Sequence, residues 1–158
     1  MLELGRTEDA QRGLRDFAAT NGGGQAVGDE ARRVDRVATA VADGRRAFAD
    51  GDLMKARASF AGALRDAESA PVVLGAAAAE LGLGKIDRCL RLCLQVLRRA
   101  DAARWRPAAL VVRGAATLLS DEGSQAVEIL REALRLDPDG AAPKATLRAA
   151  LRLSLIHI

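Results

Sequence analysis

Two cysteines four residues apart, Cys89 and Cys93, are the first side chains in this 158-residue sequence whose type and spacing could do chemistry. On a helix that spacing places both thiols on one face, as a metal site or a redox pair requires. A zinc site needs about four ligands, and the one histidine, His157, stands next to the last residue. Both cysteines also occupy helix-packing positions, where a free cysteine behaves as a small hydrophobe. We therefore predict core packing, with no metal and no cofactor.

The stretch Gly-Leu-Gly-Lys at residues 82–85 suggests a phosphate-binding loop. The P-loop pattern, however, requires Gly where Ala79 stands and Ser or Thr where Ile86 stands. This stretch therefore predicts a turn between helices. The sequence also offers no Ser, His and Asp arrangement for nucleophilic catalysis, so we expect a protein that is not an enzyme.

Composition favours a strongly helical, soluble chain. Hydrophobic residues make up 49% and aromatic residues 3%, and no apolar run reaches the length of a membrane span. The net charge of +3 divides into −1 over residues 1–50, +3 over 51–100 and +1 over 101–158. This distribution is too even for a nucleic-acid patch. The first ten residues lack a signal-peptide pattern, so the expected location is cytoplasmic, with neither nucleic acid nor membrane as a partner.

The elements that carry these residues are helical hairpins. In residues 41–64 the small side chains of Gly44, Ala56 and Ala63 would let two helices approach closely. The larger side chains of Phe48, Leu53 and Phe60 would fill the space between and beside these helices. Asp50, Gly51 and Asp52 predict the turn, with Asp52 as the cap of the second helix. The segment therefore predicts a helix–turn–helix unit.

The same unit recurs along the chain. In residues 74–97 the places of Ala56, Phe60, Ala63 and Leu64 are taken by Cys89, Cys93, Val96 and Leu97. In residues 111–140 the register is kept by Gly114, Ala126, Leu130, Ala133 and Leu134, and Pro138 ends the second helix. A partial copy near the start contains Gly5, Ala10, Leu14 and Phe17. The equivalent small positions are therefore 10, 56, 89 and 126.

These residues resemble the tetratricopeptide repeat, or TPR, with "ALRLDPDG" at 133–140 as the most specific stretch. No copy has the early Trp of that repeat, and Cys89 stands where Ala is usual. The resemblance implies an all-α, right-handed solenoid of hairpins. The expected division is 1–18, the second helix of a truncated repeat; 19–28, a Gly-rich turn; 29–70, a repeat with an extended first helix; 71–104 and 105–140, two further repeats; and 143–152, the start of a following helix.

Three features resemble the middle of TPR co-chaperones that carry a C-terminal J domain. They are the partial repeat at 1–18, the extended first helix of the repeat at 29–70, and the "EALRLDPD" ending. This resemblance implies a non-catalytic protein-binding scaffold, a fragment of a co-chaperone that works with heat-shock chaperones in protein folding. A TPR adaptor in trafficking or complex assembly is the alternative. A J domain in the downstream sequence would decide between them.

In a stacked array the first helices line a concave groove that binds proteins or peptides. The groove residues expected from this register are Val41, Arg45, Phe48, Leu74, Ala78, Leu81, Val111, Val112, Ala115 and Leu118. TPR domains that hold the acidic tails of chaperones use a clamp whose positions here are Val41, Arg45, Gly75, Ala108 and Val112. Arg45 alone of these side chains can donate a hydrogen bond, so we expect no tail binding. Trp105 could be an exposed anchor for a partner, since Trp is common at binding hot spots. We expect it instead to lie in the core or to cover a junction between repeats.

The last six residues, "LSLIHI", break the Ala- and Arg-rich bias of the chain. They resemble the translation of a sequencing adaptor, CTG-TCT-CTT-ATA-CAC-ATC. We therefore expect residues 153–158 to be adaptor-derived, and we assign no function to His157.

Overall fold

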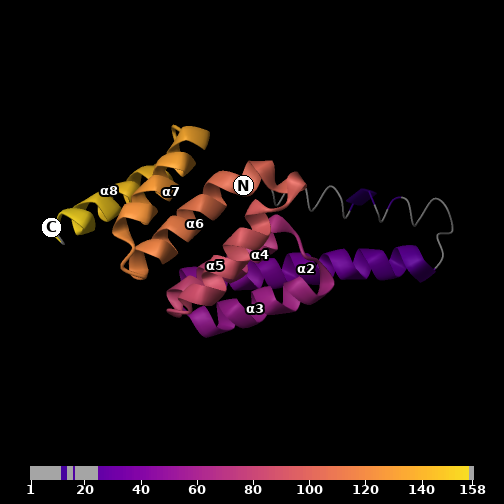
Figure 1. Ribbon diagram of the computed structural model, residues 1–158. Helices are drawn as coiled ribbons and strands as arrows, with labels where there is room; N and C mark the ends of the chain where they lie inside the picture. Colours follow the sequence, from indigo (N-terminus) through magenta and orange to yellow (C-terminus); the bar gives the residue numbers. More distant parts are fainter. Residues whose placement is uncertain (1–11, 14–15, 17–24, 157–158) are drawn as a thin grey trace.

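The computed structural model describes residues 12–13, 16 and 25–156, and within that part of the chain the regular structure is helical throughout. Three hairpins and one further helix follow in order: α2 (Gln25–Ala49) with α3 (Leu53–Asp66), α4 (Ala70–Gly82) with α5 (Ile86–Leu97), α6 (Arg106–Leu119) with α7 (Gly123–Leu136), then α8 (Ala141–Ile156). A short 3-10 helix, η1 (Ala100–Trp105), joins α5 to α6. Figure 1 shows the hairpins stacked from α2 to α8. The predicted all-α solenoid is confirmed.

The helices form two layers. Each helix packs on the one before it, and the first helices of the hairpins, α2, α4, α6 and α8, also contact one another in series. Within the described residues, the second helices α3, α5 and α7 do not contact each other in this way. The first helices therefore share one continuous layer, as in solenoids whose repeats contact only their neighbours.

The predicted packing register is confirmed by burial. The small positions Ala56, Cys89 and Ala126 are fully buried. The positions four residues later and seven residues later are also buried: Phe60, Cys93 and Leu130, then Ala63, Val96 and Ala133. These three positions per hairpin lie one helical turn apart, so each second helix presents a single buried stripe to its neighbours.

The turns also follow the sequence. The Asp52 side chain accepts a hydrogen bond of 3.0 Å from the backbone N–H of Lys55 and so caps α3. Gly51 has a φ of +78° and Gly84 a φ of +71°, the left-handed conformation that glycine adopts without strain. Gly84 lies in the Gly-Leu-Gly-Lys stretch between α4 and α5, which confirms that this stretch is a turn.

Helix α2 begins earlier than expected. It starts at Gln25, so residues 25–28 of the expected Gly-rich turn are helical. Ion pairs between residues three apart support this start: Asp29 with Arg32 at 3.2 Å and Glu30 with Arg33. Arg36 then contacts Asp66 at the end of α3 at 3.0 Å, and this hydrogen bond lowers the pKa of Asp66. In Figure 1 the first part of α2 projects past α3.

The chain ends also differ from the expected division. Helix α8 starts at Ala141, two residues before the expected 143, with Pro143 in its first turn, where proline is tolerated. It runs on to Ile156, into the expected tail 153–158. The expected second helix of a truncated repeat, residues 1–18, lies outside the described residues except for 12–13 and 16.

Candidate protein-binding face

The ten predicted groove residues lie on α2, α4 and α6. They recur at steps of four and three residues, which keeps side chains on one side of a helix. The rows are Val41, Leu74 and Val111; Arg45, Ala78 and Ala115; and Phe48, Leu81 and Leu118, with Val112 beside the first row. We call this set the first-helix face. Because α2, α4 and α6 contact one another in series, they bring these rows next to one another.

The centre of the face has small side chains, and its most exposed members come from α2. Ala78 and Ala115 are half-buried at equivalent positions of α4 and α6. Arg45, their equivalent on α2, is exposed. Phe48 lies one turn further along α2, and 41% of its surface is exposed. The face therefore has one exposed aromatic ring, that of Phe48, next to a centre of small, half-buried side chains.

The larger aliphatic members are half-buried because one side of each packs on the core. Val41 packs against the cluster around Ala47 and Phe60, and Leu81 and Val112 pack against the cluster that contains Cys89 and Cys93. In the same way Val111 packs against Leu110, Ile129 and Ala133, and Leu118 against Val127, Leu130 and Ala150. Each of these side chains therefore has one side packed on the core and part of its surface exposed.

Leu74 departs from the expected set. It is only 8% exposed and belongs to the core cluster that includes Val96 and Ala102. The cause is η1, which packs against α4 and covers that position. In the sequence the small positions Cys89 and Ala126 are 37 residues apart and Ala56 and Cys89 are 33 apart. The 3-10 helix between α5 and α6 was not predicted.

Trp105 lies at the end of η1, half-buried against the same core cluster, which joins α4 and α5 to the start of α6. The guanidinium carbon of Arg104 lies 5.6 Å from the centre of the indole ring, within cation–π range. The prediction that Trp105 covers a junction between repeats is confirmed.

Four of the five clamp positions have no side-chain donor. At Gly75 a Cβ atom would lie 2.3 Å from Cε1 of Phe60, so a donor side chain cannot be accommodated there without displacing the ring. Ala108 is exposed and Val112 half-buried, and neither side chain has a donor. Arg45 is therefore the single side-chain donor among the clamp positions.

A buried charge, which the sequence analysis did not single out, lies away from this face. Glu80 is 3% exposed, and its Oε1 lies 3.0 Å from Arg57 Nε of α3 and 3.2 Å from Arg88 Nε of α5. The other oxygen, Oε2, is buried without a hydrogen-bond partner. The sequence signal is a single acidic residue inside the apolar run of α4. Glu80 ties the first hairpin to the second.

Cys89 and Cys93 are fully buried in one cluster with Ala77 and Ala116, which confirms their predicted role in the core. The hydrogen bond with Cys89 and burial both raise the pKa of Cys93, so the nucleophilic thiolate is disfavoured. Across the described ranges, no group of three His, Cys, Asp or Glu side chains is placed to hold a metal ion. No helix in those ranges is both long enough and apolar enough to cross a membrane.

Two solved structures with a similar fold are TPR domains. The TPR domain of Arabidopsis OM64 superimposes with a TM-score of 0.67 at 20% identity, covering 80% of this chain and 99% of that one. The first TPR domain of human RPAP3 gives 0.64 at 18% identity, covering 73% of this chain and 90% of that one. No protein-family model and no curated protein matches the sequence. The chain therefore has the TPR-type solenoid fold.

Proposed function

We propose that this protein is a non-catalytic scaffold whose first-helix face binds an amphipathic helix of another protein. The observation that carries this proposal is the nearly uncharged character of the face, with Phe48 exposed at one end and Ala78 and Ala115 half-buried at the centre. A helix that inserts apolar side chains at spacings of three and four residues matches such a surface. An acidic peptide does not, because only Arg45 offers a charge.

We further propose that the chain is a cytoplasmic co-chaperone segment that works with heat-shock chaperones in protein folding. The support is the sequence resemblance to the middle region of J-domain TPR co-chaperones together with the TPR fold. One fold hosts many functions, so the alternative function is that of a TPR adaptor in trafficking or complex assembly. Binding to the chaperones distinguishes the co-chaperone from the adaptor.

The test is binding to purified Hsp-seventy and Hsp-ninety, each prepared whole and without its acidic C-terminal tail. We expect the chain to bind at least one of them, with equal affinity for the whole and the tail-less form. The double substitution A78E/A115E places two charges at the centre of the first-helix face and should weaken binding roughly tenfold or more, because each carboxylate would be desolvated without a partner.

The matched control is A58E/A61E, which adds the same charges at exposed positions of α3. It should bind like the unchanged chain. Binding that needs the acidic tail would overturn the proposed mode of recognition. No binding to either chaperone would overturn the co-chaperone assignment in favour of the adaptor.

A further inference from the structure

Two arginines from different hairpins share one oxygen of a buried carboxylate. Glu80 of α4 is 3% exposed, and its Oε1 lies 3.0 Å from Arg57 Nε on α3 and 3.2 Å from Arg88 Nε on α5. Because both contact the same atom, the two guanidinium groups lie side by side, although the backbones of α3 and α5 are not in contact within the described ranges. We call Arg57 and Arg88 the arginine pair.

The arginine pair uses only part of its hydrogen-bonding capacity on Glu80. A guanidinium often pairs with a carboxylate through two parallel N–H groups, one to each oxygen. Here both arginines reach Oε1, and Oε2 is buried without a hydrogen-bond partner. In the part of the chain that the structure describes, no hydrogen bond engages a terminal Nη atom of either arginine. The Nη donors of both side chains are therefore available to a further acceptor.

Solvent reaches the arginine pair from the side opposite to Glu80. The side chain of Arg57 is 35% exposed and that of Arg88 is 55% exposed, whereas the Glu80 side chain is almost fully buried. Both arginines stand on second helices, so the pair lies in the other layer from the first-helix face. An acceptor from outside the chain can therefore reach both guanidinium groups at once.

The local charge suits a doubly charged anion. Lys85 and Arg91 stand three residues before and three residues after Arg88, a spacing that makes side chains neighbours on a helix, and both are exposed. With the arginine pair they make four cations, against the two carboxylates of Glu80 and Asp87. Two positive charges are left uncompensated. A phosphate monoester carries a charge of about −1.5 to −2 near neutral pH.

We infer that the arginine pair is an anion site that binds a phosphate monoester, the group carried by phosphoserine and phosphothreonine side chains. Such a group has three acceptor oxygens that point in different directions, so two guanidinium groups from different helices can donate to it together. The planar fork of arginine matches two phosphate oxygens, which the single ammonium of lysine does not. Glu80 positions the pair by binding one Nε of each arginine.

A carboxylate and a nucleic acid fit this site less well. The two oxygens of a carboxylate lie in one plane, and the fork of one arginine satisfies both. A nucleic acid is held by many phosphate contacts along its strand, whereas this site offers one pair of arginines on a chain whose net charge is +3.

The test follows the Nε–H signals of the arginine pair by NMR in the full chain at about pH 7.5, above the second phosphate pKa of about 6. The probe is a peptide of about ten residues, Gly and Ala around one phosphoserine. Both signals should shift, with a dissociation constant on the order of 1 mM from a few charge-assisted hydrogen bonds. The same peptide with Ser or Glu at that position should bind roughly tenfold more weakly or less.

Glycerol phosphate is the second probe, because it carries the same group without a polypeptide. Tighter binding of the phosphopeptide would support the site and assign it to a phosphorylated partner protein. Equal binding of the two probes would support the site and assign it to small phosphorylated compounds.

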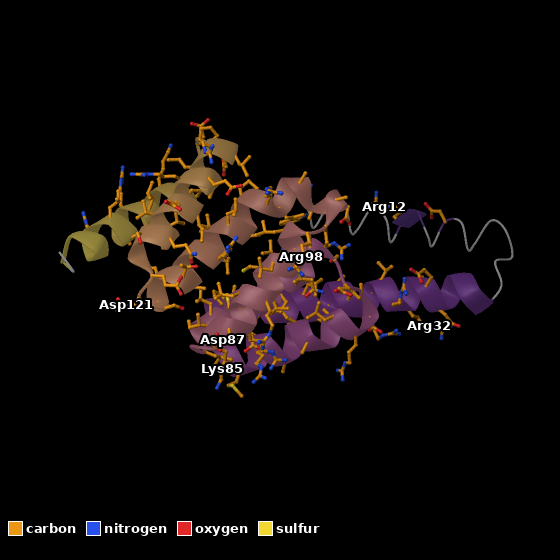
Figure 2. All side chains as sticks on the ribbon, in the orientation of Figure 1. Arg12, Arg32, Lys85, Asp87, Arg98 and Asp121 are labelled. Atoms are coloured by element: carbon orange, nitrogen blue, oxygen red, sulfur yellow. The ribbon has the colours of Figure 1, made fainter. Side chains whose placement is uncertain are left out.

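Removal of both arginines alone would leave the Glu80 carboxylate buried and unpaired, so the test variant R57M/E80M/R88M replaces the whole network with apolar side chains. Backbone amide signals should show that it binds the phosphopeptide roughly tenfold more weakly. The matched control R98M makes the same change in net charge and should keep its affinity within about twofold. Figure 2 shows Arg98 at the opposite end of α5 from Lys85 and Asp87.

A second variant, R57K/R88K, keeps both charges and both partners of Glu80 but loses the forked donors, so it should bind roughly fivefold more weakly. Equal affinity in R57K/R88K would indicate diffuse attraction and overturn the inference. So would equal losses in R98M and R57M/E80M/R88M, equal binding of the Glu peptide, or no shift of the arginine signals. Because A78E/A115E should bind the phosphopeptide normally, this site and the first-helix face are tested separately.

Discussion

Gly75 of α4 lies directly against the ring of Phe60 of α3, so that a Cβ atom at Gly75 would stand 2.3 Å from Cε1 of the ring. On its other side the same ring faces Gly44 of α2, where a Cβ atom would lie 3.0 Å away. Phe60 therefore fills the space between the first helices of two successive hairpins. A Cβ atom at Gly75 is therefore excluded unless the ring moves, whereas one at Gly44 needs only a small shift of the ring. Neither residue has a positive φ, so the reason for glycine here is steric.

This arrangement predicts strong coupling between Gly75 and Phe60. Phe60→Ala should destabilise the fold by about 3–5 kcal/mol, because it empties a buried site. Gly75→Ala should cost about 1–2 kcal/mol, since the clash exceeds the gain of about 1 kcal/mol in helix propensity. In the Phe60→Ala background the same change should become neutral or stabilising. A double-mutant cycle by denaturant unfolding measures this, and additive effects would contradict the packing.

The Glu80 carboxylate is buried, whereas its partners Arg57 and Arg88 are half-buried and exposed. Removing the acid and removing its partners should therefore have different costs. Replacing both Arg57 and Arg88 with Met leaves a buried carboxylate unpaired and should cost about 3 kcal/mol or more. Glu80→Met removes the buried charge, including the unpartnered Oε2, and should cost much less. Chemical denaturation of the three proteins compares these costs. Equal losses would show that Glu80 is solvated in solution.

Burial of Cys89 and Cys93 predicts unreactive thiols. In the folded chain a disulfide reagent such as DTNB should modify neither cysteine on the timescale of seconds, whereas both should react at once in denaturant. Cys89→Ala should cost about 1 kcal/mol, far less than Phe60→Ala, because less volume is lost. Rapid labelling of the folded protein would mean that α5 opens away from α4.

Removal of residues 153–158 should leave the melting temperature within about 2 °C of the full chain, which corresponds to about 0.5 kcal/mol. Among the residues whose side chains the structure describes, Leu147 and Ala150 pack α8 on α7, and both lie before the cut. Only the helical signal of the last turn should be lost in circular dichroism. A large fall in melting temperature would instead assign these residues a part in the fold and count against an adaptor origin.

The hairpins could be predicted from the sequence because their signals are local. Ala56, Cys89 and Ala126 are each followed by apolar residues four and seven positions later. On a helix this spacing places all three side chains on one side, and that side is buried in each hairpin. The turn at Gly51 and the cap at Asp52 are equally local, since they depend on backbone conformation and on one nearby N–H group.

What only the tertiary structure decided is how neighbouring hairpins meet. The burial of Leu74 under η1, the contact of Gly75 with Phe60, and the pairing of Glu80 with Arg57 each join residues from different helices. Such contacts depend on the angle and distance between helices, which follow from the packing of many side chains at once and leave no periodic signal in the chain.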